Sequence, residues 1–324
     1  MEEFDFLATT PQSFDEQTLA VFQHQAKNCK VYRDFIGYLN INPKKITSPK
    51  EIPFLPIQFF KSHQIISGSE SIQETFLSSG TTGTSQSKHF VTNISLYEKS
   101  YLNAFEQFYG DITEYTILAL LPSYLERKGS SLIYMVEDII NKSENPNSGF
   151  YLHNHKELFD KLQEQEKQQK KTLLIGVSFA LLDFIEKYPC ELQHTVVMET
   201  GGMKGKRKEM IREELHEELK KGFGVQKIHS EYGMTELLSQ AYFDESQKFN
   251  CPPWMKILIR DTEDALSLLP NEKSGGINVI DLANYNSCSF IATQDLGKVY
   301  NDGTFDVLGR FDNSDIRGCN LLIQ

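Results

Sequence analysis

Strands and helices alternate through the middle of the sequence, and this alternation is the strongest constraint on the fold. Apolar runs without alternating polar residues, typical of strands buried on both faces, occupy residues 116–121, 172–177 and 195–198. Helical patterns occupy residues 93–109, 180–188 and 207–221, the last with an expected apolar stripe of Ile211, Leu215 and Leu219. Strands that alternate with helices predict a mostly parallel, doubly wound α/β sheet.

The two ends of the chain differ from this middle part. Residues 14–39 are predicted to form a helix, because apolar side chains recur there at helical spacing. After Phe249, short β segments are expected at residues 257–260, 276–281 and 289–293, followed by a hairpin of 297–300 and 305–308. We therefore expect one domain over residues 1–324, with an α/β portion at 1–248 and a β-rich subdomain at 249–324.

Composition argues against several classes of protein. The formal net charge of −11 indicates an acidic surface, which argues against a general nucleic-acid binder. The five cysteines are scattered and include no C-x-x-C pair, so neither a zinc ribbon nor a disulfide framework is predicted. The start lacks a basic signal-peptide segment, and the longest apolar stretch, residues 172–185, is too short to span a bilayer. We expect a cytoplasmic protein without a nucleic-acid partner or a membrane span.

A run rich in glycine and hydroxyl residues, Ser-Ser-Gly-Thr-Thr-Gly at 78–83, precedes Lys88. Glycines let the backbone turn tightly and aim its N–H groups at one point, hydroxyls add donors, and the lysine adds positive charge. The run is not a Walker loop, because Thr84 rather than a lysine follows the second glycine. It predicts a polyphosphate-binding loop, and the alternative is a flexible surface loop.

A second segment, residues 229–236, follows a predicted strand at 225–228. It is therefore expected at the carboxyl end of a strand, where open α/β sheets bind ligands. Tyr232 offers a ring for stacking, Thr235 a hydroxyl, and Glu236 a hard oxygen ligand suited to magnesium. By residue type alone, the segment could equally be an ordinary turn.

A third pair of residues, Asp295 and Arg310, belongs to the β-rich end of the chain. A carboxylate that follows a strand can accept both hydroxyls of a ribose, and an arginine after a hairpin can pair with that carboxylate or with a phosphate. The alternative is hairpin chemistry alone, with the arginine as a solvated charge.

In this order, the three segments resemble motifs of the adenylate-forming superfamily of acyl-CoA synthetases and luciferases. Residues 78–88 resemble its phosphate loop, 232–236 its Tyr-Gly-x-Thr-Glu motif, and 309–312 its Gly-Arg-x-Asp hinge motif. Residues 52–61 and 121–131 further resemble the acyl-protein synthetase branch, which is related to phenylacetate-CoA ligases. The resemblance implies the large N-terminal domain of that superfamily, with mostly parallel sheets flanked by helices and a β-rich subdomain.

The resemblance also implies residues that bind ATP and Mg²⁺. Those expected at the phosphates are Ser79, Gly80, Thr81, Thr82 and Gly83, with Lys88 neutralising charge. Tyr232 is expected to stack on the adenine with Gly201 and Gly202 beside its edge, and Gly233 is a further cofactor-binding residue. Thr235 is assigned to the α-phosphate, Glu236 to Mg²⁺, and Asp295 with Arg310 to the ribose.

The implied reaction joins a carboxylic acid, fatty or aromatic, to AMP and then passes the acyl group to a thiol. Cys319 is a candidate acceptor, the alternative being an ordinary residue of a tail strand. The chain ends at Gln324, so we expect the superfamily's C-terminal domain and its lysine to be missing, and a partner subunit is one way to replace them. Other candidate acceptors are a carrier protein, another protein cysteine and CoA.

Two other functions stay open at this point. A carboxylate–CoA ligase would show saturable dependence on CoA, whereas an acyl-protein synthetase would acylate itself without CoA. A catalytically inactive, nucleotide-binding scaffold subunit is the rival from another class of protein. The presence of Glu236, Asp295 and Arg310 together argues against the scaffold, because a scaffold needs no magnesium ligand.

Overall fold

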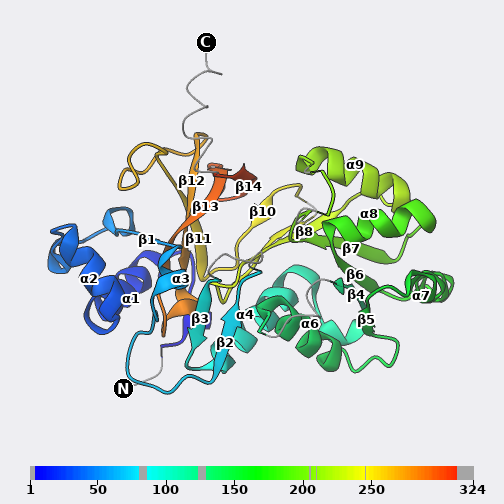
Figure 1. Ribbon diagram of the computed structural model, residues 1–324, viewed down its shortest axis with the longest axis horizontal. Coiled ribbons are helices and arrows are strands. Elements are labelled where there is room, and N and C mark those ends of the chain that lie inside the picture. The colour runs from blue at the N-terminus through cyan, green and yellow to red at the C-terminus, as the bar shows by residue number, and fades with distance from the viewer. Residues whose placement is uncertain are drawn as a thin grey trace, which may run out of the picture. The chain divides into compact units, whose positions relative to one another are not determined.

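The predicted alternation of strands and helices is present in the computed structural model, which describes residues 4–79, 86–122, 129–203, 206–208, 210–244 and 246–311 (Figure 1). The chain divides into two compact units that interleave in sequence. Unit 1 comprises the residues up to Ser100, Thr235–Ser239 and the residues from Asn250 onward, and unit 2 comprises Tyr101–Met234 and Gln240–Phe249. The expectation of a single domain divided at residue 248 stays a prediction.

Unit 2 contains a parallel sheet in the order β8-β7-β6-β4-β5. Its strands are β4 (Thr116–Leu120), β5 (Gly149–Tyr151), β6 (Thr172–Val177), β7 (Thr195–Thr200) and β8 (His229–Tyr232), and β9 (Ala241–Phe243) pairs antiparallel with β8. Every residue of β4 and β6 is buried, which is why their apolar runs show no alternation.

Helices cover both faces of this sheet. They are α6 (Ser131–Lys142), α7 (His155–Lys167), α8 (Ser178–Lys187) and α9 (Arg212–Phe223). Helices α8 and α9 pack side by side on one face and α6 lies on the other, as expected of a doubly wound sheet (Figure 1).

Unit 1 contains an antiparallel meander of four strands. They are β11 (Met255–Arg260), β12 (Ser274–Asp281), β13 (Phe290–Val299) and β14 (Phe305–Arg310), and the short strand β1 (Leu55–Pro56) lies parallel to β13. The expected turn between the last two strands is present, with the Tyr300 N–H donating to the Thr304 carbonyl and Gly303 at a φ of 88°.

The other elements of the chain are mostly short. The helices are α1 (Phe14–Asn28), α2 (Lys30–Tyr38), α3 (Phe59–Ser62) and α4 (Ile94–Tyr109). The strands are β2 (Glu74–Leu77), β3 (Lys88–Val91) and β10 (Phe249–Asn250). The 3₁₀ turns are Phe6–Ala8, Pro43–Lys45, Pro49–Glu51, Ile112–Glu114 and Leu282–Asn284.

The predicted helix over residues 14–39 is two helices, because the chain breaks at Cys29. Cys29 has an extended backbone with φ −91° and ψ 104°, and it forms an isolated β-bridge with Ser67. Its side chain is fully buried. A tertiary contact thus overrides a locally continuous helical pattern.

The helix predicted over residues 207–221 begins later, at Arg212, and Ile211 is not part of its apolar stripe. Ile211 precedes the first turn and is 61% exposed, whereas Leu215 and Leu219 are buried as expected. Arg207 instead pairs with Asp183 and Glu186 of α8, which holds the preceding segment outside the helix.

Two further strand predictions were wrong in position. The strand expected at residues 225–228 is β8, at His229–Tyr232, because Gly224 ends α9 in the left-handed conformation and the following residues form the connection. The two segments expected at 289–293 and 297–300 form one strand, β13, so Asp295 lies within a strand instead of after one.

Within the described residues, no helix has the length and apolar character needed to cross a membrane.

Candidate functional site

Glu236 is the central acidic residue of the candidate site in unit 1. Its side chain is 5% exposed, and its carboxyl is hydrogen-bonded to the Ser87 hydroxyl. Burial raises the pKa of the Glu236 carboxyl, the Ser87 bond and the Arg310 charge oppose this rise, and the charge of Asp295 adds to it. A buried carboxylate in this state would gain from a bound cation.

The Mg²⁺ site expected from the sequence would have one protein carboxylate, that of Glu236. Within the described residues, no group of three or more His, Cys, Asp or Glu side chains could enclose a metal ion. Mg²⁺ commonly takes one or two protein carboxylates and completes its octahedron with substrate phosphates and water. A single buried carboxylate such as Glu236 is compatible with Mg²⁺ only if the other ligands are phosphate or water oxygens.

Asp295 and Arg310 form a cross-strand pair beside Glu236. They are directly opposite each other on β13 and β14, and Arg310 Nε donates to Asp295 Oδ1 at 3.2 Å. The aspartate side chain is 10% exposed and the arginine side chain 76% exposed. The structure thus brings together three of the predicted site residues, with the arginine free to reorient toward solvent or a ligand.

Ser78 and Ser87, which flank most of the Ser/Gly run, are hydrogen-bonded to each other between β2 and β3. The Ser87 N–H donates to Ser78 Oγ at 2.9 Å, and the Ser78 N–H donates to the Ser87 carbonyl at 3.1 Å. Ser79 is exposed, and Lys88 is exposed at the start of β3. Gly80, Thr81, Thr82 and Gly83 lie outside the described residues, so their predicted role stays a prediction.

The Thr235–Ser239 segment is held in place by side chains that sequence reasoning missed. Asn284 Nδ2 donates to the Glu236 carbonyl at 2.8 Å. The Asp281 carboxylate accepts from the Leu238 and Ser239 N–H groups at 2.9 and 3.0 Å, and from Ser239 Oγ at 2.6 Å. His89 Nδ1 lies 2.9 Å from the Thr235 carbonyl. No local motif marks these residues, because each acts on backbone far away in the sequence.

The first two residues of the Tyr-Gly-x-Thr-Glu motif, Tyr232 and Gly233, lie at the end of strand β8 in unit 2. Tyr232 is the last residue of β8, and its buried ring meets Phe249 edge to face at 5.9 Å. A side chain on Gly233 would meet the Glu231 carboxylate at 2.2 Å, so this position is restricted to glycine unless Glu231 moves. Gly201, with a φ of 72°, and Gly202 follow the end of β7.

The half-buried Glu231, beside Gly233, was not predicted from the sequence as part of the site. Glu231 Oε2 accepts a hydrogen bond of 2.5 Å from Thr200 Oγ1. Burial raises the pKa of Glu231 to about 7, the Thr200 bond opposes the rise, and the charge of Glu199 adds to it. Thr200 and Glu231 are partners in the parallel register, which sets their approach.

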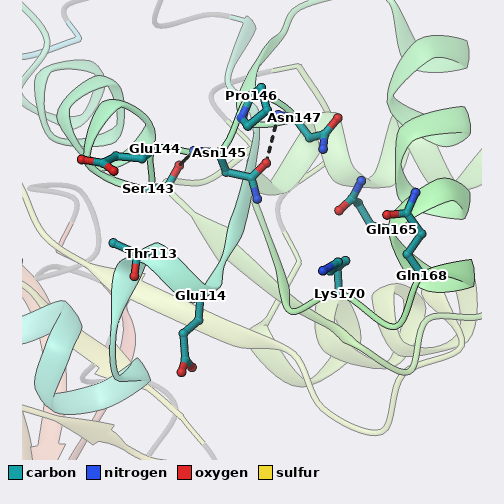
Figure 2. Close-up of a pocket in the computed structure, with 10 residues that line it drawn as sticks. All are labelled: Thr113, Glu114, Ser143, Glu144, Asn145, Pro146, Asn147, Gln165, Gln168 and Lys170. Atoms are coloured by element: carbon teal, nitrogen blue, oxygen red, sulfur yellow. Dashed lines mark hydrogen bonds between the residues drawn. The ribbon is translucent and has the colours of Figure 1, made fainter.

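A polar depression of about 450 Å³ lies in another part of unit 2 (Figure 2). Asn145, Asn147, Gln165 and Lys170 are among the side chains that line it. These residues belong to loops and helix ends at the amino-terminal edge of β4 and β6, whereas Gly201 and Tyr232 lie at carboxyl-terminal ends of strands. Within unit 2, the depression is therefore separate from Gly201 and Tyr232.

Comparison with known proteins finds relatives in structure only. No family model matches the sequence, and no curated protein matches it. An open conformation of 2-hydroxyisobutyryl-CoA ligase in complex with 2-HIB-AMP and CoA aligns with a TM-score of 0.67 at 12% identity, covering 96% of this chain and 81% of that one. ATP-bound MatB from Rhodopseudomonas palustris aligns with a TM-score of 0.56 at 17% identity, covering 75% of this chain and 49% of that one.

A luciferase-like enzyme from the nonluminescent mealworm Zophobas morio aligns with a TM-score of 0.52 at 15% identity, covering 75% of this chain and 59% of that one. These neighbours are all of the adenylate-forming superfamily, and the chain has the fold of their N-terminal domain. The chain spans about half the length of the MatB structure. The narrower resemblance to acyl-protein synthetases, and their relation to phenylacetate-CoA ligases, stay predictions.

Proposed function

We propose that this chain activates a carboxylic acid with ATP, giving an acyl-adenylate and pyrophosphate. The main support is that Asp295 and Arg310 form an ion pair whose charges act on the pKa of the buried Glu236 carboxyl, in a fold shared with adenylate-forming enzymes. The ATP-bound MatB structure supports ATP as the nucleotide, and the 2-HIB-AMP of the ligase structure supports an acyl-adenylate product.

In this reaction the protein would mainly position the two substrates and neutralise phosphate charge. A carboxylate oxygen of the acid attacks the α-phosphorus, and the bond between that phosphorus and pyrophosphate breaks. Thr235 would donate its hydroxyl to an α-phosphate oxygen, and Glu236 would hold Mg²⁺. Bound there, Mg²⁺ would neutralise phosphate charge, which Lys88 would also offset from the start of β3.

The remaining site residues would bind the nucleotide. Ser79, Gly80, Thr81, Thr82 and Gly83 would bind the phosphates. Tyr232, Gly201 and Gly202 would bind the adenine, and Gly233 would be a further nucleotide-binding residue. Asp295 would accept hydrogen bonds from the ribose hydroxyls. Arg310, whose guanidinium is mostly exposed beside this aspartate, would assist it.

The second step would pass the acyl group from AMP to a thiol. The thiolate attacks the acyl carbon, and AMP leaves as the bond to its phosphate oxygen breaks. Among the described cysteines, Cys29 and Cys288 are buried. Burial raises the pKa of Cys190 to about 12 and raises that of Cys251 as well, so none of the four is an activated nucleophile. Self-acylation would therefore depend on Cys319, which lies outside the described residues.

A carboxylate–CoA ligase is the second candidate. One observation favours it: the 2-hydroxyisobutyryl-CoA ligase structure, which covers 96% of this chain, contains CoA. An external thiol, either CoA or a carrier protein, would also remove the need for an acceptor cysteine in the chain itself.

The deciding experiment is incubation with MgATP and a panel of fatty and aromatic acids, first without CoA. Pyrophosphate release that requires an acid is the expected result. An acyl-sized, hydroxylamine-labile mass increase that disappears in Cys319→Ser would identify an acyl-protein synthetase. Product formation that instead saturates with CoA would identify a CoA ligase.

The inactive scaffold is the outcome that would refute the proposal. It predicts nucleotide binding without pyrophosphate release for any acid, with or without CoA. The exposed Glu263→Gln is a matched control for Glu236→Gln, since both remove one carboxylate charge.

A further inference from the structure

His89 is a buried histidine next to the Thr235–Glu236 segment, and it has no part in the proposed chemistry. It lies on β3 and is 1% exposed. The Phe60 ring packs against it edge to face at 5.6 Å, and its Nδ1 lies 2.9 Å from the Thr235 carbonyl oxygen. One nitrogen of this imidazole therefore faces backbone of the motif that carries the proposed magnesium ligand.

The contact fixes which nitrogen carries the proton. Burial lowers the pKa of His89 to about 4, so the ring is neutral at neutral pH and has a single N–H. A carbonyl oxygen only accepts hydrogen bonds, so the N–H must be on Nδ1. Within the described residues, Nε2 has no hydrogen-bond partner. Among the residues that the structure describes, the bond to the Thr235 carbonyl is therefore the hydrogen bond that the His89 ring makes.

Ser87, just before β3, and His89, within it, contact the two residues of the Thr-Glu pair. Ser87 and His89 are two residues apart and buried, while Lys88 between them is exposed. This alternation places the first two on one face of the extended chain. Ser87 bonds the Glu236 carboxyl, and His89 bonds the Thr235 carbonyl. The following carbonyl, that of Glu236, is held by Asn284 from another element.

We propose that His89 is a positioning residue, whose Nδ1–H fixes the Thr235 carbonyl and so orients the Thr235 hydroxyl and the Glu236 carboxylate for MgATP. The inference rests on the proposed function. Thr235 and Glu236 lie in a turn without ladder hydrogen bonds, so their orientation depends on such side-chain contacts. Substituting a residue that orients a metal ligand typically lowers metal affinity or activity by about 10–100-fold.

Two amide variants separate the hydrogen bond from the polarity of the side chain. His89→Asn puts an amide N–H close to the position of Nδ1, whereas His89→Gln puts it close to Nε2, away from the Thr235 carbonyl. His89→Phe keeps the ring volume and removes the donor, which guards against loss of folding in the amide variants. His153→Gln, at an exposed histidine, is the surface control.

The readouts are acid-dependent pyrophosphate release over a range of Mg²⁺ and acid concentrations, and hydrogen–deuterium exchange of peptides spanning residues 232–240. For His89→Gln and His89→Phe, we expect kcat to fall about 10–100-fold and the Mg²⁺ requirement to rise, with the KM for the acid within about twofold. His89→Asn is expected to stay within about threefold of wild type. Exchange should rise in this peptide for His89→Gln and His89→Phe only.

The two ways of failing are distinguishable. If wild type releases pyrophosphate and His89→Phe, still folded, matches it in kcat and Mg²⁺ dependence, the role of His89 is refuted and the proposed function stands. Equal losses in His89→Asn and His89→Gln would also refute it, because only one of them loses the bond. If wild type is inactive with every acid, the proposed function fails, and with it the inference that His89 positions a catalytic segment.

Discussion

Acidification is expected to destabilise the protein through His89. The ring is buried beside Phe60 and a carbonyl, and burial lowers its pKa to about 4 from an ordinary value of 6.5. In the unfolded chain the imidazole takes up a proton near pH 6.5, whereas in the folded protein it does so only near pH 4. Between these values the unfolded state binds more protons, so the free energy of unfolding falls as the pH falls.

The magnitude follows from these two pKa values. The loss of unfolding free energy caused by His89 is small at pH 7, grows as the pH falls, and is complete only below pH 4. Between pH 7 and pH 5 the linkage relation gives a loss of about 2 kcal/mol in the free energy of unfolding. A loss of this size is large compared with the total stability of a typical domain.

Urea denaturation of wild type and His89→Asn at pH 7, 6 and 5 measures this effect. Other titrating groups are common to both proteins, so their difference in unfolding free energy isolates the histidine. We expect the advantage of wild type over the variant to shrink by about 2 kcal/mol from pH 7 to pH 5. Parallel pH profiles for the two proteins would show that His89 is not buried in its neutral form, and the reasoning would fail.

Three further predictions concern the site and the sheet. Glu236→Gln should lower acid-dependent pyrophosphate release at least about 100-fold without lowering the Tm, while Glu263→Gln leaves the rate unchanged; normal turnover in both would remove Glu236 from the site. Asp295→Asn, which weakens acceptance from the ribose, should raise the KM for ATP about tenfold in initial-rate assays, and an unchanged KM would contradict its role. Gly297→Ala should destabilise the protein by about 1–3 kcal/mol in urea denaturation, because the added carbon would meet the Asp306 carbonyl oxygen at 2.6 Å; an unchanged midpoint would refute this.

The parts of the fold that follow from local pattern were predictable. Strand β6 occupies the predicted residues, because a run buried on both faces needs no partner-specific information to be recognised. The final hairpin was predictable because Asn-Asp-Gly favours a tight turn. The break at Cys29 was not, since the residue that forms its β-bridge, Ser67, lies far along the chain. The shift of the motif strand to β8 also depends on its partner, because the parallel register with β7 decides which residues pair.

The candidate site also contains residues that the sequence pattern identifies and residues that it does not. Glu236, Asp295 and Arg310 could be chosen from the sequence because their side chains have recognisable chemistry, and the structure brings these three together. Residues that hold the backbone gave no such signal. His89 lies 146 residues from the carbonyl to which it donates, and Asn284 lies 48 residues from its own.

This difference has a physical origin in the Thr235–Ser239 segment itself. The segment is neither helix nor strand, so its backbone groups have no ladder to satisfy them, yet most of it is buried. Buried N–H and carbonyl groups must find partners, and here side chains supply them. The Asp281 carboxylate takes two consecutive N–H groups, while His89 and Asn284 take two consecutive carbonyls. A segment held at four backbone groups has little freedom to turn, and the Ser87 bond to the Glu236 carboxyl restricts that side chain as well.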